Sequence, residues 1–429
     1  MKREQGGRED ARRKLAVFGA ILLVGLGAGV AGVALVKLQQ IVQAIAYGYL
    51  QAPETDYFVE VTSAEPLRRF LVLVLCGAIG GAGWVCIHRF GRPLLTVKKA
   101  VVEEGATMPF FTTLCHTVLQ TATVAMGSPL GKEAAPRELS IAITGLWLKR
   151  TKLFADERMR KSLLAAAAGA GLAAIYNAPL AGTLFTMETL LLTWDLEGVG
   201  LAAVACAVAV FVQRLAMGDV VTYHVPSFAF DGWTLLWCLI MAPVLAFVVI
   251  LFEKSRRRLP QHNRKSATMI VSSICAFAAI GAIAAFFPLV LGNGQIGNEL
   301  SFMGQADTGE AFAYWLLKWA CVLLALYAGA YGGNIQPSIM MGGMLSFGVA
   351  ALWNAAGLPF VPCATAAFVG GAVFLGLAQK MPATAIAFLV EITRCSASCF
   401  LPLCLCVGVA CVCYKAMGGK LPVVRAPGK

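Results

Sequence analysis

Residues 131–138 read Gly-Lys-Glu-Ala-Ala-Pro-Arg-Glu, and they follow the run Met-Gly-Ser-Pro-Leu at 126–130. This stretch places one carboxylate, Glu133, between helix-breaking residues and an apolar run that begins at Ile141. An ionisable group at membrane depth is energetically expensive and marks a candidate functional site. The alternative is a glutamate that caps a helix at the membrane surface, where an acid in the first turn stabilises the positive end of the helix dipole.

The composition around this stretch is that of a membrane protein. Of the 429 residues, 59% are hydrophobic and 14% are charged, and the mean hydropathy is +0.74. Soluble domains carry about a quarter charged residues. Apolar segments recur along the chain, and several are shorter than the roughly 20 residues of a spanning helix. Short apolar segments interrupted by Gly and Pro predict discontinuous helices that line a cavity rather than face lipid.

The charge pattern predicts how the chain sits in the bilayer. The net charge of +12 comes from clusters of Lys and Arg between apolar runs and near both termini. By the positive-inside rule we expect a multi-pass protein of the cell inner (plasma) membrane with both termini cytoplasmic. The clusters are not spread over one face, so we predict the lipid bilayer and not nucleic acid as partner. The first apolar run has no small-residue cleavage site, so we expect a mature helix rather than a removed signal peptide.

The cysteine and histidine patterns predict neither a metal nor a cofactor. Most of the 14 cysteines lie inside apolar runs, where they behave as small hydrophobes. The sequence contains no pair of Cys-x-x-Cys units, no His-Glu-x-x-His and no Gly-x-Ser-x-Gly. We therefore expect a protein that is not an enzyme. His116 lies in an apolar stretch, and a hydrogen-bonded packing role is the favoured interpretation.

The opening motif has a partner about two hundred residues later. Residues 331–338 read Tyr-Gly-Gly-Asn-Ile-Gln-Pro-Ser and again separate two apolar segments. Aligning Pro136 with Pro337, 201 positions apart, sets Glu133 opposite Asn334. The two motifs therefore occupy the same place in two halves of the chain.

A second pair of stretches supports the same repeat. Residues 179–189 match residues 382–393, with Glu188 opposite Glu391 at a spacing of 203. Internal repeats in a transporter place the substrate site near the midplane, where discontinuous helices meet. We predict five regions: a cytoplasmic tail at 1–14, a first transmembrane repeat with its final connecting helix at 15–250, a basic cytoplasmic connector at 251–266, a second transmembrane repeat at 267–416 and a cytoplasmic tail at 417–429.

The repeat predicts an anion site. Glycines before the helix starts, at Gly131 and at Gly332 and Gly333, should leave backbone N–H groups free, and helix N-termini carry partial positive charge. Two such ends that converge from the two halves bind an anion without a full positive charge. Glu133 then stands where the anion should sit. An ionised carboxylate fills the site and a protonated one leaves it, so one residue links anion passage to proton passage.

Four stretches resemble, in the same order, the hallmarks of the CLC family of chloride channels and anion/proton antiporters. They are GKEAAPRE at 131–138, NAPLAGTLF at 177–185, LGNGQ at 291–295 and GGNIQPS at 332–338. The resemblance implies an all-α polytopic membrane protein, with two inverted-topology repeats of tilted, partly discontinuous helices. It also implies a homodimer with one pore per subunit. Glu133 falls on the gating glutamate of the family, and the anion-binding residues implied are Gly131, Lys132, Ala134, Gly333, Asn334, Ile335 and the pore tyrosine, Tyr414.

The departures from the family pattern resemble its fluoride-exporting branch. Ala134, Ala135 and Pro136 follow the glutamate where Gly-Pro is common, and Asn334 stands in place of an apolar residue. The serine that usually touches chloride would align within residues 91–95, which contain none. A side-chain amide that replaces lost water suits the strongly hydrated fluoride ion. The other interpretation of Asn334 is a plain helix cap. Leu94, Leu95 and Met108 are candidates for lining the region where that serine would lie, and the spacing does not choose among them.

Glu188 is the second acid to consider. In chloride-coupled antiporters of the family, two consecutive acids stand here and the second accepts the internal proton, but this chain reads Glu188-Thr189. Either Glu188 or a water path delivers the proton, or Glu188 is structural. We predict a fluoride/proton antiporter that exports fluoride in exchange for protons, and the alternative is a chloride/proton antiporter or chloride channel of the same family.

Overall fold

The computed structural model describes residues 2–48, 61–223, 225, 230–260 and 263–422, with side chains from Arg12 onward. The described residues form helices and the loops that join them, and an isolated β-bridge pairs Gly131 with Gly333. Eight helices in this part of the chain are long and apolar enough to cross a membrane. The prediction of an all-α polytopic membrane protein is confirmed.

The first half of the chain carries the motif around Glu133. Its long helices belong to the scaffold, whereas α4 and α8 are short pieces of the kind that line a cavity. The helices are α1 (Lys2–Tyr47), α3 (Pro66–Phe90), α4 (Val97–Val102), α5 (Phe110–Ala125), α6 (Ala134–Leu148), α7 (Glu157–Tyr176), α8 (Pro179–Phe185) and α9 (Leu196–Met217). A π-helical segment, Thr186–Leu191, continues α8 and contains Glu188.

The second half repeats this succession of long and short helices. They are α10 (Gly232–Arg257), α11 (Thr268–Phe286), α12 (Gln295–Phe302), α13 (Thr308–Tyr327), α14 (Ile335–Ala355), α15 (Cys363–Ala378), α16 (Pro382–Thr393) and α17 (Phe400–Ala416). The helix α6 begins after Glu133, and its counterpart α14 begins after Asn334. The repeat spacing therefore places the two motifs at equivalent helix starts.

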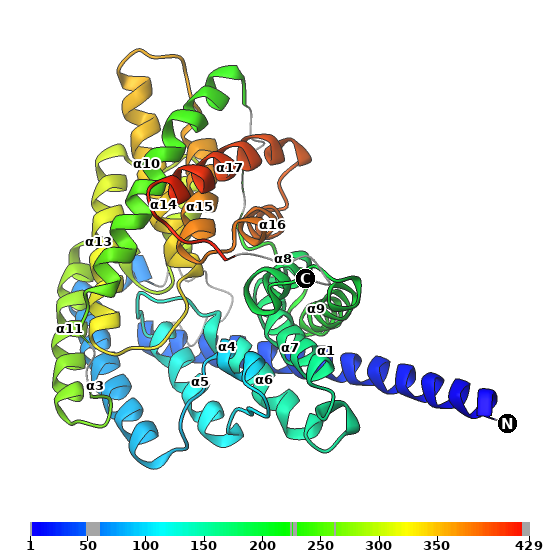
Figure 1. Ribbon diagram of the computed structural model, residues 1–429. Coiled ribbons are helices and arrows are strands. Elements are labelled where there is room, and N and C mark those ends of the chain that lie inside the picture. Colours follow the sequence, from blue (N-terminus) through cyan, green and yellow to red (C-terminus); the bar gives the residue numbers. More distant parts are fainter. Residues whose placement is uncertain (1, 49–60, 224, 226–229, 261–262, 423–429) are drawn as a thin grey trace.

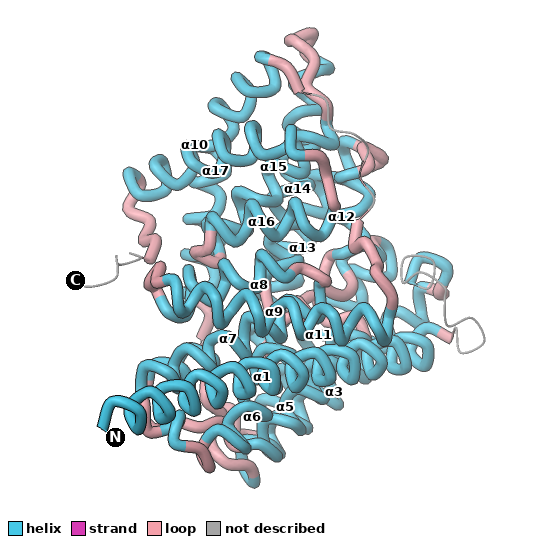
Figure 2. Tube along the Cα trace, turned by 90° about the vertical axis from the view of Figure 1, so that its right-hand side faces the viewer, coloured by secondary structure: helices cyan, strands magenta, loops and turns pink. Residues whose placement is uncertain are grey.

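The two halves pack against each other along equivalent helices. Figure 1 shows α3 beside α11 and α8 beside α16, and both pairs are in contact. The helix α1 runs along the first half, between α7 and α9 on one side and α5 and α6 on the other (Figure 2). The short helices α8 and α16 thus meet at the boundary between the halves.

Backbone conformation marks the same repeat. Asn177 and Lys380, 203 positions apart, have φ of 55° and 60°, and Leu192 and Arg394, 202 positions apart, have φ of 56° and 50°. Residues other than glycine rarely adopt this left-handed conformation. Asn177 lies between α7 and α8, and Lys380 lies between α15 and α16. Leu192 ends the π-helical segment that continues α8, and Arg394 ends α16. Their recurrence at the repeat spacing shows that both halves follow the same chain path here.

Small residues bring the helices of each half close together. A Cβ atom added at Gly171 of α7 would overlap the carbonyl oxygen of Pro136 in α6. In the second half, a Cβ at Gly342 of α14 would overlap the carbonyl oxygen of Gly370 in α15. Close backbone approach strengthens packing between helices in a bilayer, where lipid is as apolar as the helix surface. The helices that carry both motifs are therefore held firmly by their neighbours.

The predicted region boundaries can be placed on these helices. The helix α1 begins at Lys2, so the described part of the predicted tail at 1–14 is helical. The predicted connector at 251–266 contains the end of α10, and residues 261–262 lie outside the described residues. Residues 423–429 of the predicted C-terminal tail also lie outside them. The division into five regions stays a prediction.

Candidate anion site

The starts of α6 and α14 meet through a pair of glycines. The N–H of Gly131 donates to the carbonyl oxygen of Gly333 at 2.6 Å, and the N–H of Gly333 donates to Gly131 at 2.7 Å. The expectation that these two N–H groups are free for an anion is therefore wrong, because each half uses its own to hold the other. The convergence of the two helix starts is nevertheless what the repeat predicts.

The Glu133 carboxylate lies across this junction and is fully buried. Its Oε1 atom accepts a hydrogen bond from the Ile335 N–H at 2.7 Å, and its Oε2 atom accepts one from the Tyr176 hydroxyl at 3.0 Å. A Cβ atom added at Gly131 or Gly333 would overlap the carboxylate. Glycine at both positions thus makes room for an acid side chain against the backbone.

This geometry excludes the simple capping role for Glu133. The side chain of Glu133 makes no capping hydrogen bond to its own helix, α6. It reaches instead to the first N–H of α14, in the other half of the molecule. A negative group at that helix start is stabilised by the dipole and by an unpaired N–H group. The carboxylate therefore occupies the kind of place that a free anion would take.

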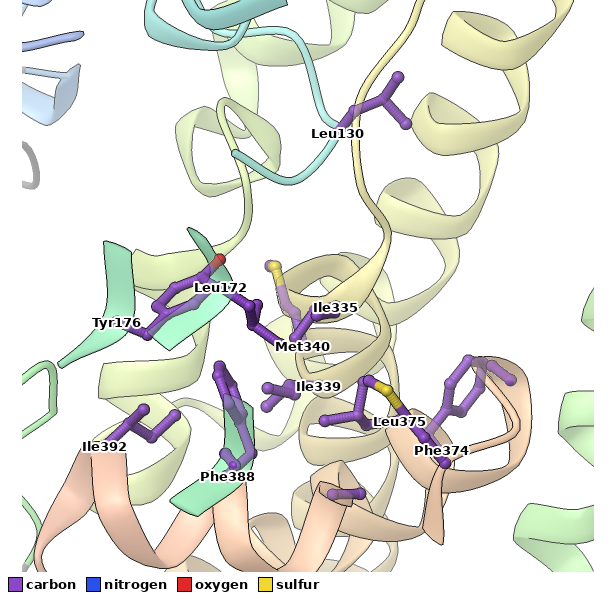
Figure 3. Close-up of a cluster of buried hydrophobic side chains, with 14 of the residues drawn as sticks. Leu130, Leu172, Tyr176, Ile335, Ile339, Met340, Phe374, Leu375, Phe388 and Ile392 are labelled. Carbon is purple, nitrogen blue, oxygen red and sulfur yellow. The ribbon is translucent and has the colours of Figure 1, made fainter. Parts of the chain in front are cut away.

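Aromatic and basic groups line the same place. The ring of Tyr176 packs edge-on against Phe388 of α16, with centroids 4.9 Å apart, and Figure 3 shows both rings and Ile335 in one apolar cluster. The Lys132 ammonium lies 5.6 Å from the centroid of the Tyr176 ring. Three elements from both halves thus enclose the carboxylate with few charges.

Polar side chains continue inward from this cluster. Gln336, the second residue of α14, accepts hydrogen bonds at Oε1 from the Tyr223 hydroxyl at 2.5 Å and from Asn298 Nδ2 at 2.8 Å. The Tyr223 hydroxyl in turn accepts a bond from Asn298 Nδ2 at 3.0 Å. All three side chains are buried, so the network is protected from solvent.

Asn334 lies on the other side of the junction. It precedes α14 without a side-chain capping bond, and its Oδ1 atom is buried without a partner among the described residues. It lines a cavity of about 510 Å³ together with Arg256, Arg257 and Arg264. Burial lowers the pKa of Arg264, so an anion nearby would favour its charged form. The cavity joins basic residues of the connector to the predicted selectivity residue.

Glu188 is held by the start of a helix in the other half. Its carboxylate accepts hydrogen bonds from the N–H of Ala383 at 3.1 Å, the N–H of Thr384 at 2.8 Å and the Thr384 hydroxyl at 2.7 Å. It also lines a cavity of about 220 Å³ with Lys415. Glu188 therefore has a structural role at the start of α16 and also faces an open space.

Its repeat partner makes the reciprocal contact. Glu391 of α16 accepts hydrogen bonds from the N–H groups of Leu180 at 2.8 Å and Ala181 at 2.6 Å, at the start of α8. Each half thus supplies one carboxylate that stabilises the positive end of the other half's short helix. The sequence repeat that pairs Glu188 with Glu391 is matched by this exchange of contacts.

Two features of the predicted site, Tyr414 and the segment at 91–95, make contacts away from Glu133. The Tyr414 hydroxyl donates to Glu253 Oε2 of α10 at 2.8 Å, and its contact is with that helix rather than with Glu133. The segment at 91–95 is exposed or half-buried, and the N–H of Arg92 donates to the Thr112 hydroxyl at 3.1 Å. Neither contact brings these residues to the Glu133 carboxylate.

His116 is hydrogen-bonded, as its sequence context suggests. Its Nε2 atom lies 2.7 Å from Gln120 Nε2 and 3.4 Å from Glu138 Oε2, and its ring packs edge-on against Tyr331 with centroids 4.5 Å apart. Glu138 also accepts a hydrogen bond from Gln120 Nε2 at 2.9 Å. The cluster joins α5 to α6.

Sequence reasoning missed Tyr176, which donates to the Glu133 carboxylate, and Gln336, whose amide lies in the buried network beside it. Tyr176 stands immediately before the NAPLAGTLF run, and Gln336 stands inside the GGNIQPS motif. The sequence pattern assigns anion-binding roles to Gly333, Asn334 and Ile335 of the second motif and to no residue of the NAPLAGTLF run. A polar residue in an otherwise apolar helix end was the available signal for Tyr176, since buried polar groups in membrane helices are commonly functional.

Fold and site together define a class of protein: a multi-pass membrane protein with two inverted repeats and a buried carboxylate where two helix starts meet. The family model described as voltage gated chloride channel matches residues 76–415. The match covers well over half of the chain, and the protein therefore belongs to the voltage-gated chloride channel (CLC) family.

Relatives and solved structures of this family span the chain. An H⁺/Cl⁻ exchange transporter, ClcA, of Klebsiella pneumoniae is 25% identical over 95% of this chain and 87% of its own length. A voltage-gated ClC-type chloride channel, ClcB, of Escherichia coli is 26% identical over 68% of this chain and 71% of its own. The fold is similar to that of a slow cyanobacterial Cl⁻/H⁺ antiporter (TM-score 0.78, 21% identity, 95% and 96% covered) and of a CLC-type fluoride/proton antiporter (TM-score 0.72, 19%, 96% and 98%).

Proposed function

We propose that the chain is an antiporter that exchanges an anion for protons, with Glu133 as gate and proton carrier. The observation that carries the proposal is the position of the Glu133 carboxylate, which accepts the Ile335 N–H and the Tyr176 hydroxyl. These are the uncharged donors that an anion would need. An ionised carboxylate and a free anion therefore compete for the same groups.

Protonation decides this competition. A neutral carboxyl group accepts hydrogen bonds more weakly than a carboxylate, because bonds to an ionised acceptor are roughly twice as strong. The protonated side chain therefore yields its donors to the anion, and the released proton lets the carboxylate return. Anion entry and proton movement are linked through one side chain.

The comparisons support chloride better than fluoride as the anion. ClcA and ClcB are named for chloride, and so is one of the two antiporters whose fold is reported above. Chloride/proton exchange is accordingly the first candidate. A chloride channel without proton exchange is a variant of this candidate, supported by the name of ClcB.

Fluoride is the second candidate, and a specific observation favours it. Asn334 places an uncapped side-chain amide between the basic cavity and the gate, and the sequence has no serine at 91–95. An amide supplies both a donor and an acceptor to a partly dehydrated ion. The solved fluoride/proton antiporter with a similar fold shows that the scaffold suits this chemistry in that protein.

The proton path on the far side of the gate is proposed to involve Glu188. The carboxylate faces the cavity of about 220 Å³ that Lys415 also lines, which supports access to water. The remaining proposals are a homodimer in the inner membrane with both termini cytoplasmic. They are supported by the family resemblance and by the clusters of Lys and Arg between apolar runs.

The experiment is ion efflux from liposomes that contain the purified protein, loaded in turn with chloride and with fluoride, while external pH is followed. Efflux of either anion with protons driven in the opposite direction supports the antiporter. Anion efflux with no proton movement would contradict it and favour a channel. The ratio of chloride to fluoride efflux then chooses between the two candidates.

A further inference from the structure

The side-chain amide of Gln336 has a fixed orientation. Its Oε1 atom accepts from the Tyr223 hydroxyl and from Asn298 Nδ2. A side-chain amide has one acceptor oxygen and one donor NH₂ group. Asn298 Nδ2 also donates to the Gln336 backbone carbonyl at 3.4 Å, and a carbonyl can only accept, so this atom is the donor NH₂ group. The Gln336 atom that it contacts is therefore the oxygen, and the Nε2 group is directed away from it.

Within the described part of the chain, the Nε2 group of Gln336 is a buried donor with no acceptor in hydrogen-bonding geometry. The residue is fully buried, and Nε2 has no hydrogen-bond partner among the described residues. The Gln336 side chain lies close to the Tyr176 hydroxyl, which donates to Glu133. Native proteins leave few such groups unpaired, and each one calls for an explanation. An anion that visits this place would satisfy it.

The backbone brings a third donor to the same point. The N–H of Ile335 belongs to the residue before Gln336 and also donates to the Glu133 carboxylate. Once the carboxylate leaves, the Ile335 N–H and the Tyr176 hydroxyl both lose their acceptor. Three uncharged donors from α7 and α14 then stand unpaired in a buried space, beside the positive end of α14.

We propose that the Tyr176 hydroxyl, Gln336 Nε2 and the Ile335 N–H form the anion-binding position next to Glu133. These groups would donate the hydrogen bonds that a serine at 91–95 donates in other members of the family. The inference rests on the proposed function, in which a small anion passes Glu133. Tyr176 and Gln336 are then residues that contact the transported ion. Tyr223 and Asn298 are positioning residues that hold the Gln336 amide in place.

Lys132 supports an anion at this position without binding it directly. Its ammonium group lies over the Tyr176 ring, 5.6 Å from the centroid. A positive charge at that range favours an anion at the hydroxyl through the Coulomb interaction in a medium of low dielectric constant.

The test is anion affinity, measured by calorimetric titration of the detergent-solubilised protein with sodium chloride and with sodium fluoride. Tyr176→Phe removes one hydroxyl and leaves the ring that packs on Phe388. We expect the Kd of the transported anion to rise about tenfold or more, because a hydrogen bond to a charged group is lost. The matched control is Tyr47→Phe, which removes a buried hydroxyl that donates to the Met126 carbonyl at 3.0 Å.

The variant Gln336→Glu tests the second donor. The substituted side chain keeps an oxygen for Tyr223 and Asn298, replaces the Nε2 donor with a second oxygen and adds a negative charge when it is ionised. We expect anion binding to weaken more than in Tyr176→Phe, since an acceptor oxygen now faces the anion. Size-exclusion chromatography checks that the variant folds, and Tyr176→Phe alone carries the test if it does not.

Repeating Tyr176→Phe in the Glu133→Gln variant distinguishes a Tyr176 that contacts the anion from one that only positions Glu133. In Glu133→Gln the carboxylate is absent, so a Tyr176 that only positions Glu133 has nothing left to do. We expect Tyr176→Phe to weaken anion binding in both backgrounds, as a double-mutant cycle would measure. A change below twofold in the Glu133→Gln background would overturn the proposed binding position.

The outcomes also separate this inference from the proposed function. A protein that binds the anion but moves no protons contradicts the antiporter, whereas the binding position is still judged by the Kd values. Intact exchange by the wild-type protein, together with a Kd that Tyr176→Phe leaves unchanged in the Glu133→Gln background, would overturn the binding position and leave the antiporter standing. A wild-type protein that binds neither anion would overturn both.

Discussion

Two pairs of repeat-related positions behave differently. At the short helices the repeat is symmetric, because Glu188 binds the start of α16 and Glu391 binds the start of α8. At the gate it is not, because Glu133 binds the start of α14 whereas Asn334 makes no capping bond. The symmetric contacts join the halves, and the asymmetric place supplies the titratable group of the proposed mechanism.

The number of donors fits this division. Glu188 accepts three hydrogen bonds at the start of α16, two of them from backbone N–H groups. Among the described residues, the Glu133 carboxylate accepts one backbone hydrogen bond, and its second donor is a side-chain hydroxyl. A carboxylate held by fewer and more mobile donors is easier to displace. The comparison therefore predicts that the two acids respond very differently to mutation.

The largest effect is expected for Glu133→Gln. The amide cannot carry a proton, so proton movement coupled to the anion gradient should be abolished while anion efflux continues. A pH-sensitive dye outside liposomes measures it, and Glu391→Gln serves as the control with a carboxylate removed elsewhere. Proton pumping that survives in Glu133→Gln would mean that the gate has been assigned to the wrong residue.

Removing the reciprocal contacts should destabilise the protein. Glu188→Ala leaves the buried Thr384 N–H and hydroxyl without their acceptor, which costs about 1–3 kcal/mol. Glu391→Ala frees the N–H groups of Ala181, which is buried, and of Leu180, which is exposed. Because Glu188 accepts three hydrogen bonds and Glu391 accepts two, we expect both variants to lose free energy of unfolding and Glu188→Ala to lose more. Denaturant titration in detergent micelles measures both losses. A loss confined to one variant would break the symmetry claimed for the two helices.

The same pair sharpens the proposal about the proton path. Glu188→Gln and Glu391→Gln remove similar contacts, but only Glu188 lines the cavity with Lys415. We therefore expect Glu188→Gln to slow proton movement in liposomes more than Glu391→Gln does. Equal proton rates in the two variants would assign Glu188 a purely structural role.

A smaller effect is expected at the asymmetric partner of the gate. Asn334→Gly removes the side-chain amide that faces the basic cavity while glycine tolerates the backbone conformation. The ratio of fluoride to chloride efflux should fall about fivefold, which corresponds to one net hydrogen bond of about 1 kcal/mol. Turnover should change little. Efflux of both anions measures it, and an unchanged ratio would leave Asn334 no part in selectivity.

The smallest effect is expected for Tyr414→Phe. The hydroxyl of Tyr414 is engaged with Glu253, so its loss should change the Kd of the anion far less than Tyr176→Phe does. The two variants remove the same group from equally buried rings, and one titration series compares them. A larger effect at Tyr414 would restore it as the pore tyrosine implied by the family resemblance.

The sequence was sufficient to predict the convergence at the gate but not its details. The spacing of 201 residues places Glu133 opposite Asn334, and the two helix starts do meet. The spacing could not show that Gly131 and Gly333 pair with each other, since a repeat gives equivalent positions and not hydrogen bonds. The expectation that the glycine N–H groups are free is wrong for that reason.

Side-chain partners between helices were the harder part. Tyr176 and Gln336 meet because α7 and α14 end and begin at the same junction, and nothing in the spacing of either motif states which way a side chain points. Tyr414 illustrates the same limit, because α17 packs on α10 and the hydroxyl finds Glu253 there. Motif position predicts an element, whereas contact depends on how that element is rotated.

The mutual bonds between Gly131 and Gly333 have a consequence for speed. They hold the main chain of both halves together at the gate, so exchange of the Glu133 carboxylate for an anion needs rotation about its own χ angles and no separation of the halves. Side-chain rotamer changes are intrinsically fast, whereas domain motions take microseconds to milliseconds. The pace of the cycle would then be set by proton delivery and ion dehydration rather than by rearrangement of the scaffold.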